Sequence, residues 1–383
     1  MVWYDISPYV ICWVLSCSFA YLASKSKSNI MKFIFSVLSI LVPSILAGIR
    51  TETVGVDVRA YAVPHYNTAV RSFSFYEYAS AERGYSLIGT EIGWYALTYI
   101  VAKAFENFNW NLFFYEFVTC TCMYIGAWKH RKFIPLPLTL FVFGIMQFNN
   151  TFNVMRQAIA CSIIFMGFDS LETKHYLKFS IYIFVASLFH TSAYFAFVYL
   201  LGFHALITSE KLNQPNNRNV KNFMLCFLVL FIFFLRPISN MLMQLMPFVS
   251  GYSNYTFVEH RNYIVGTMIL GELVVFLLYP KGGRRFFAKN PGGEKMFDFY
   301  RYLLIFSSAY YFGPHFVSRG LLYFEYVNIL GYASLPYFIR EKSLKALISV
   351  SVTFALFAFF YLFFMVMNMS KAGSFPYVTI FDN

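Results

Sequence analysis

The sequence predicts an all-α polytopic integral membrane protein with about twelve transmembrane helices and further in-plane or re-entrant helices on the periplasmic side. Hydrophobic residues make up 58% of the 383 residues, charged residues only 13%, and the mean hydropathy is +0.55. Such a composition leaves too little polar surface for a soluble protein of this length. The apolar residues also fall into runs of roughly 20, the length that crosses a hydrocarbon core of about 30 Å.

These apolar runs are read in order as spans, with both ends of the chain on the outer side. The first run follows Met-Val-Trp-Tyr-Asp, which lacks the basic region of a cleaved signal peptide, so we expect it to be a permanent span. Residues 1–383 then form a single transmembrane domain. The spans are residues 6–23, 31–48, 110–128, 133–150, 156–170, 177–190, 192–207, 221–237, 263–280, 299–313, 320–338 and 344–367.

Lysines and arginines set the orientation of these spans. Six short polar segments hold 20 of the 30 basic residues, and 14 of those 20 are lysine. Because basic residues concentrate in cytoplasmic loops, we assign these segments to the cytoplasm. Eight of the other ten are arginines, mostly at span ends on the opposite side, where a planar guanidinium suits bidentate contact with phosphate. The cytoplasmic segments are residues 25–32, 129–132, 174–178, 211–221, 281–301 and 340–345.

Two longer outer regions interrupt the spans. Residues 85–105 are apolar enough to cross a membrane, but a crossing there would move residues 129–132 outside and invert every later loop. We therefore read residues 49–108 as one outer region that holds an in-plane or re-entrant helix packed on the bundle. A second outer loop is predicted at residues 237–262.

Several classes of function are excluded by composition and spacing. The net charge of +12 is dispersed over short loops, with no basic soluble domain to hold a duplex, so no nucleic-acid partner is expected. The six cysteines lie in apolar runs, as small buried hydrophobic residues do. The outer segments contain no Asp-x-Asp pair and no histidine cluster with ligand spacing, which predicts a site without metal or cofactor.

Polar residues suited to catalysis instead lie at the outer ends of spans that are far apart in the sequence. Under the predicted topology they all reach one membrane face, where they can converge on one cavity. They occur in Gly48-Ile49-Arg50, Gly55-Val56-Asp57 with Tyr61, Glu91-Ile92-Gly93-Trp94-Tyr95, Asn153-Val154-Met155-Arg156-Gln157, Phe189-His190-Thr191-Ser192, and Arg319 with Tyr323-Phe324.

In their order and spacing these motifs resemble the Wzy/EpsG-type polymerases, which assemble bacterial surface polysaccharides. The resemblance covers most of the chain and extends to Pro376-Tyr377, although the family more often has a proline after the glutamate that corresponds to Glu91. It implies a metal-independent glycosyltransferase that polymerises undecaprenyl-pyrophosphate-linked repeat units into an O-antigen or exopolysaccharide at the outer face of the inner membrane. The implied partners are the lipid-linked donor and acceptor, membrane lipids and a chain-length regulator.

The arginines are the predicted ligands of the pyrophosphate. Negative charge that grows on this leaving group must be neutralised by a metal or by fixed cations. Arg156 and Arg319 are the first candidates, followed by Arg50 and Arg261. Arg156 begins an apolar helix, where its positive charge opposes the helix dipole, so something should compensate for it, and a bound anion would do so. The alternative is that outer arginines only reach towards lipid phosphates.

The remaining candidates handle the proton and the sugars. A base within hydrogen-bond reach would take the proton of the acceptor hydroxyl. His190, Asp57 and Glu91 are the candidates, and His190 is favoured because its unperturbed pKa lies near 6.5. Structural alternatives are a loop cap or a salt bridge to Arg50 for Asp57, and a hydrogen bond to a neighbouring helix for His190. The predicted sugar contacts are Tyr61, Tyr95, Tyr323 and Gln157.

Two other functions are compatible with these residues. A flippase or secondary transporter could bind the same lipid-linked glycan, but it should show repeat symmetry and ionisable residues near mid-span, whereas most charges here fall at one face. A membrane acyltransferase or an O-antigen ligase could use the same arginines and histidine. The ligase differs from a polymerase only in its acceptor, so the residues alone leave this choice open.

Overall fold

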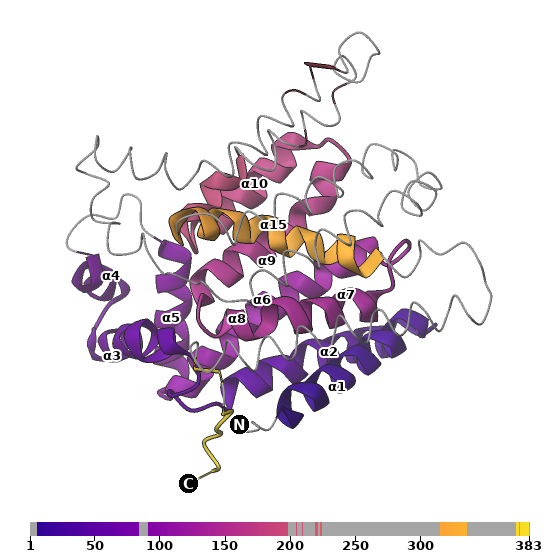
Figure 1. The fold of residues 1–383 in the computed structure, drawn as a ribbon. Coiled ribbons are helices and arrows are strands. Elements are labelled where there is room, and N and C mark those ends of the chain that lie inside the picture. The colour runs from indigo at the N-terminus through magenta and orange to yellow at the C-terminus, as the bar shows by residue number, and fades with distance from the viewer. Residues whose placement is uncertain are drawn as a thin grey trace, which may run out of the picture. The chain divides into compact units, whose positions relative to one another are not determined.

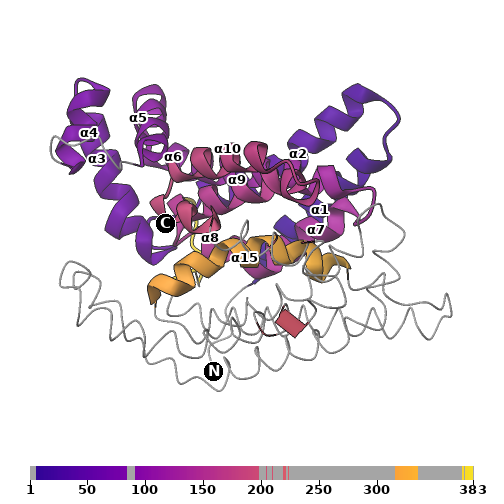
Figure 2. The ribbon, with the colours of Figure 1, turned by 90° about the horizontal axis from the view of Figure 1, so that it is seen from above.

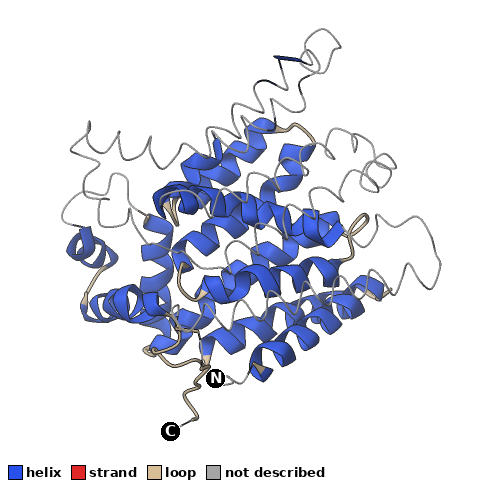
Figure 3. Cartoon of the chain, viewed as in Figure 1, coloured by secondary structure: helices blue, strands red, loops and turns tan. Residues whose placement is uncertain are grey.

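The computed structural model describes residues 6–83, 91–197, 315–334, 373–374 and 376–382, with residues 204, 209, 219, 220 and 223. Within them the backbone is helix and loop (Figure 3), and a single antiparallel β-bridge joins Arg50 to Thr379. The chain divides into two compact units, Met1–Tyr194 with Phe354–Asn383, and Phe195–Thr353. The predicted outer loop at 237–262, with Arg261, lies outside the described residues.

The helices that form the bundle of the first unit coincide with the first six predicted spans to within a few residues. Five of these spans are single helices: α1 (Ser7–Lys25), α2 (Asn29–Gly48), α6 (Phe108–His130), α9 (Met155–Glu172) and α10 (Tyr176–Ser187). The fourth span consists of three successive helical segments, α7 (Leu136–Phe143), η2 (Gly144–Phe148) and α8 (Asn149–Thr151). Among the described residues, α1 and α2 are the helices long and apolar enough to cross a membrane. At 23 residues, α6 also has the length of a span, about 34 Å, but it carries Asn109, Asn111 and Glu116.

Small residues let the helices of the first unit approach one another closely. Helices α1 and α2 lie side by side (Figure 1), joined by Ser16 and Ser39, whose hydroxyls each donate to the other residue's carbonyl at 2.7 and 2.8 Å. Gly126 of α6 faces Phe165 of α9, and Gly144 of η2 faces the ring of Trp13. A side chain at either glycine would collide with an aromatic ring, as expected where helices pack through small residues.

The first unit has two chemically different ends. Tyr124 of α6 contacts Ser36 of α2, whereas Asn109, near the start of α6, donates to the carbonyls of Gly48 and Arg50. Helices α6 and α9 run in the same direction, since His130 meets Glu172 at their C-terminal ends. The end that carries residues 25–32, 129–132 and 174–178 is called the basic end here, and the end that carries residues 49–57, 91 and 152–156 is called the site end.

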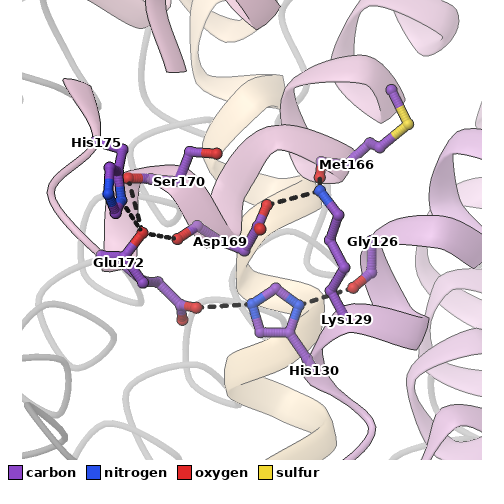
Figure 4. Close-up of polar contacts among 9 residues, drawn as sticks. Gly126, Lys129, His130, Met166, Asp169, Ser170, Glu172 and His175 are labelled. Carbon is purple, nitrogen blue, oxygen red and sulfur yellow. Dashed lines mark hydrogen bonds and ion pairs between the residues drawn. The ribbon is translucent and has the colours of Figure 1, made fainter. Parts of the chain in front are cut away.

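Ion pairs join α6 to α9 at the basic end (Figure 4). Lys129 Nζ lies 2.8 Å from Asp169 Oδ1, and His130 Nε2 lies 2.8 Å from Glu172 Oε2. Nδ1 of His130 is 2.8 Å from the Gly126 carbonyl. Burial acts to lower the pKa of His130, but the Glu172 carboxylate and the Gly126 carbonyl raise it above its usual value.

Three short helices flank this bundle at one side (Figures 1 and 2): α3 (Val63–Arg71), α4 (Phe75–Arg83) and α5 (Ile92–Phe105). They surround a buried aromatic cluster in which the ring of Tyr95 lies 5.5 Å from His65 and 5.6 Å from Tyr78. His65 pairs with Glu82 at 3.0 Å, and this hydrogen bond lowers the pKa of Glu82. With 14 residues, α5 is about 21 Å long, shorter than a membrane core, and begins at Ile92, seven residues after the start of the predicted in-plane helix.

The second unit is described through one long helix, α15 (His315–Ser334), which corresponds to the predicted span at 320–338. From Gly320 to Ser334 its residues are buried, including Tyr323 at 1% exposure and the polar residues Glu325 and Asn328. Arg319, near the start of the helix, is partly exposed. From Gly320 onward the helix is thus buried on all sides, as an apolar helix of a large protein or a membrane span is.

Candidate functional site

The carboxylate of Glu91 joins three distant segments at the site end of the first unit. Arg156 Nη1, at the start of α9, donates to Glu91 Oε2 at 2.6 Å. The backbone N–H of Thr191 donates to Oε1 at 3.2 Å, and Nδ1 of His190 lies 4.0 Å from the same oxygen. The guanidinium of Arg156 also lies 5.6 Å from the ring centre of Tyr61. We call Tyr61, Glu91, Arg156, His190 and Ser192 the Glu91 site.

Backbone contacts fix the position of Glu91. It is the N-cap residue of α5, and its carbonyl accepts hydrogen bonds from Trp94 and Tyr95. The next turn is tied to the end of α10, because Gly93 N donates to the Leu188 carbonyl at 2.7 Å. A Cβ at Gly93 would lie 3.0 Å from that carbonyl oxygen, so glycine permits this close approach. The carboxylate therefore has its place before any ligand binds.

Arg156 has the anion that its position requires. A positive charge at a helix N-terminus is unfavourable because it opposes the helix dipole, and the Glu91 carboxylate offsets this cost. Among the described residues, Glu91 is the one hydrogen-bond acceptor for this guanidinium. Arg156 is 28% exposed and Glu91 only 6%, so the pair lies at the boundary between the core and the surface. Within the described residues, the other N–H donors of Arg156 make no hydrogen bond.

The hydrogen bonds around His190 define its tautomer. The backbone N–H of Ser192 donates to Nδ1 at 3.1 Å, and the Ser192 hydroxyl lies 2.7 Å from the same atom. A nitrogen that accepts from a backbone N–H carries no proton, so in the neutral ring the proton is on Nε2. Neutral His190 therefore presents a hydrogen-bond donor at Nε2, and Nδ1 is used within its own turn.

A loop at the site end, residues 49–57, leads into the π-helix η1 (Val58–Ala62), which carries Tyr61. Gly55 has φ of +103°, and a Cβ there would lie 2.7 Å from the Phe152 carbonyl oxygen. Val56 N donates to Asn153 Oδ1 at 2.8 Å, so the loop is attached to the segment just before Arg156. Asp57 follows, partly exposed, as the N-cap residue of η1, while Tyr61 is 40% exposed.

Arg50 lies in the interior of the site end. It is 1% exposed, its guanidinium lies 3.9 Å from the ring centre of Phe152, and its Nε and Nη1 atoms have no hydrogen-bond partner among the described residues. Burial lowers the pKa of Arg50 to about 10, while the buried carboxylate of Glu116 acts in the opposite direction. A direct contact of Arg50 with a lipid pyrophosphate would require the overlying residues to move.

The other predicted residues have different surroundings. Tyr95 is 4% exposed in the aromatic cluster of α3 to α5, one turn after Glu91. Gln157, next to Arg156, is 1% exposed. Arg319 and Tyr323 belong to α15 of the second unit. The structure thus brings together Glu91, Arg156, His190 and Tyr61.

The residues that support this group were not among the predicted site residues. The ring of Trp94 stacks on Tyr115 at 4.0 Å, and the Tyr115 hydroxyl contacts Thr98 and Asn111. Ser192 was noted only as part of a motif, although its N–H sets the tautomer of His190. Tyr115 and Asn111 lie four apart within a predicted span, where polar residues separated by one helical turn are a signal for such a network.

The site end and the basic end are separated by the length of α9, about 27 Å for 18 residues. Apolar helices with basic residues at one end and a polar ion-pair site at the other define a membrane-embedded helical protein with a polar functional site. The described residues contain no group of three or more His, Cys, Asp or Glu side chains placed to hold a metal ion.

The family of the chain follows from comparison with known proteins. The EpsG family model matches residues 33–379. The chain therefore belongs to the EpsG family, a Wzy-type polysaccharide polymerase family, which confirms the resemblance found in its motifs. No curated protein and no solved structure matches the chain.

Proposed function

We propose that this protein polymerises undecaprenyl-pyrophosphate-linked oligosaccharide repeat units into a long O-antigen or exopolysaccharide at the outer face of the bacterial inner membrane. Membership of the EpsG family supports a polysaccharide polymerase acting on lipid-linked oligosaccharides. The observation that carries the assignment of the site is the meeting of Arg156, Glu91 and His190 from three segments. Basic residues favour the cytoplasm, so the site end would face outward in a topology of about twelve spans.

The proposed reaction exchanges one bond at the anomeric carbon of the donor. The hydroxyl oxygen of the acceptor sugar forms a bond to this carbon, while the bond from the carbon to the pyrophosphate oxygen breaks. The electron pair of that bond leaves with the lipid pyrophosphate, and the hydroxyl proton passes to a base. A fixed cation beside the leaving oxygen lowers the barrier because negative charge develops there. No metal ion is part of this proposal.

Arg156 is the proposed ligand of the leaving pyrophosphate. Glu91 holds its Nη1 atom, which orients the guanidinium and leaves other donors for a phosphate oxygen. An arginine held in this way suits a bidentate contact that a lysine could not reproduce. Arg319 and Arg261 remain proposed as further pyrophosphate ligands, whereas the burial of Arg50 suits a structural role.

His190, Asp57 and Tyr61 are the residues proposed to handle the proton and the sugar. With Nδ1 accepting from Ser192, neutral His190 offers Nε2–H as a donor to a sugar or phosphate oxygen. Asp57, partly exposed ahead of η1, is then the proposed proton acceptor. Tyr61 is proposed to stack on a sugar ring, since it is exposed beside Arg156. Tyr95, Tyr323 and Gln157 remain proposed sugar contacts that require access to buried positions.

The test is polymerisation by the purified protein in lipid nanodiscs, with lipid-linked repeat units as both donor and acceptor and with EDTA present. Wild-type protein should form a ladder of products on a gel, and Arg156→Ala should leave single units. Arg156→Lys should rescue poorly. Arg131→Ala is the matched control, because Arg131 lies at the basic end against Trp128 and should be dispensable.

Each alternative has its own outcome in this assay. A ligase would form no ladder without its separate acceptor, and a transporter would move the lipid-linked unit without extending it. A full ladder from Arg156→Ala would contradict the assigned site.

A further inference from the structure

We propose that residues 373–382, called the tail segment, are a positioning element that holds residues 49–57, called the site loop, in the geometry needed for polymerisation. This inference rests on the proposed function. The tail segment (yellow in Figure 1) and the site loop belong to the same compact unit, although more than 300 residues separate them in the sequence. Pro376-Tyr377, within this segment, resembles the family motifs, but the sequence predicted no role for these residues.

Backbone hydrogen bonds join the tail segment to the site loop along its length. Thr51 N donates to the Val378 carbonyl at 3.0 Å, and Ile380 N donates to the Ile49 carbonyl at 2.9 Å. These two bonds flank the bridge between Arg50 and Thr379. Gly55 N donates to the Gly373 carbonyl at 2.8 Å, so the tail segment is also bound just before Asp57.

Two tyrosines anchor the tail segment to the helices. Tyr377 donates its hydroxyl to the Leu46 carbonyl in the last turn of α2. Tyr9 of α1 donates its hydroxyl to the Ser374 carbonyl at 2.7 Å, and the two tyrosine rings meet edge to face at 5.3 Å. These contacts connect the tail segment to both α1 and α2.

The site loop is therefore held from two sides. The tail segment binds it at Ile49, Thr51 and Gly55, and Asn153 binds it at Val56. Asn153 lies three residues before Arg156, and Val56 lies next to Asp57. A displacement of the site loop would thus move Asp57 and η1, with Tyr61, relative to Arg156.

The tail segment also helps to enclose Arg50. Thr379 is the bridge partner of Arg50, and it follows Tyr377, whose hydroxyl is held by the Leu46 carbonyl, by two residues. Because the Nε and Nη1 atoms of Arg50 have no hydrogen-bond partner in the described part of the chain, water would favour a state in which the guanidinium is exposed. The tail segment opposes that state, and loosening it should release the site loop.

The experiment measures kcat and KM of ladder formation for Tyr377→Phe and Tyr9→Phe in nanodiscs. Each substitution removes one hydroxyl and keeps the ring, so the fold should survive. We expect kcat to fall about three- to tenfold, the equivalent of one hydrogen bond, with KM nearly unchanged. Hydrogen exchange at residues 49–57 should become faster in both variants. Tyr76→Phe is the matched control, since Tyr76 is 59% exposed on α4.

A double-mutant cycle separates positioning from general stability. Asn153→Ala loosens the site loop from its other side, so its effect on kcat should be non-additive with that of Tyr377→Phe. If Arg156→Ala abolishes the ladder while Tyr377→Phe and Tyr9→Phe keep wild-type kcat and exchange, the positioning role is wrong and the proposed function stands. Higher activity in the tyrosine variants would mean an inhibitory latch and overturn the proposal. A normal ladder from Arg156→Ala overturns both proposals.

Discussion

The ion pair between Glu91 and Arg156 offers the sharpest quantitative test of the site. Replacing Glu91 with glutamine keeps the shape and one hydrogen-bond acceptor but removes the charge. Breaking a fully buried pair by removing one partner costs about 3–5 kcal/mol. Arg156 is 28% exposed, however, so water can solvate it, and we expect Glu91→Gln to lower the free energy of unfolding by about 1–3 kcal/mol.

The assay is a double-mutant cycle of Glu91→Gln and Arg156→Gln, with reversible unfolding in detergent micelles as the readout. The chain supplies a matched control pair, Arg59 and Glu52, which lie 3.3 Å apart with 61% and 50% of their side chains exposed. Surface pairs of this kind contribute about 0–1 kcal/mol. A coupling energy for Glu91 and Arg156 no larger than that of the control pair would refute the claim that Glu91 holds Arg156 in place.

Three further predictions concern single positions. His190→Asn supplies an amide oxygen that can accept from Ser192 N in place of Nδ1, so the melting temperature should stay within a few degrees of wild type while ladder formation is lost; retained activity would exclude His190 as a donor. Gly55→Ala should destabilise the protein by about 1–3 kcal/mol, because φ is +103° and the new Cβ would meet the Phe152 carbonyl; an unchanged melting temperature would contradict this geometry. The pKa of His130, beyond the predicted span at 110–128, is raised, so its stabilising contribution should be complete below about pH 6.5 and lost as pH rises through the folded-state pKa, and His130→Gln should flatten this part of a melting-temperature profile.

Hydropathy was sufficient to predict the bundle helices of the first unit, α1, α2 and α6 to α10, but it did not predict α3 and α4 in the outer region. A span must be apolar over about 20 residues, so the third predicted span at 110–128 became α6 at Phe108–His130. The internal π-helix of Gly144–Phe148 was not predictable, because it depends on how Gly144 packs against Trp13. The bounds of a helix can be predicted from local hydropathy, whereas an irregularity such as a π-helix depends on contacts with other helices.

The site was predictable in its members but not in its pairings. The positive-inside rule predicted Glu91, Arg156 and His190 at one face. The prediction for Arg156 was a bound anion, whereas the carboxylate beside it belongs to Glu91, 65 residues away. Sequence spacing cannot say which carboxylate and which arginine meet. For the same reason the contacts of Arg50 with the Phe152 ring and with Thr379 could not be predicted. Contacts such as Tyr9 to Ser374, 365 residues apart, leave no local pattern.

The most direct test of the central claim is an experimental structure of the protein in nanodiscs with an undecaprenyl-pyrophosphate-linked repeat unit bound. We expect pyrophosphate density within about 3 Å of the Arg156 guanidinium, which is the distance of a charge-assisted hydrogen bond, and the first sugar next to Tyr61 and His190. Pyrophosphate density at the basic end, against Lys129 or Lys174, would contradict it.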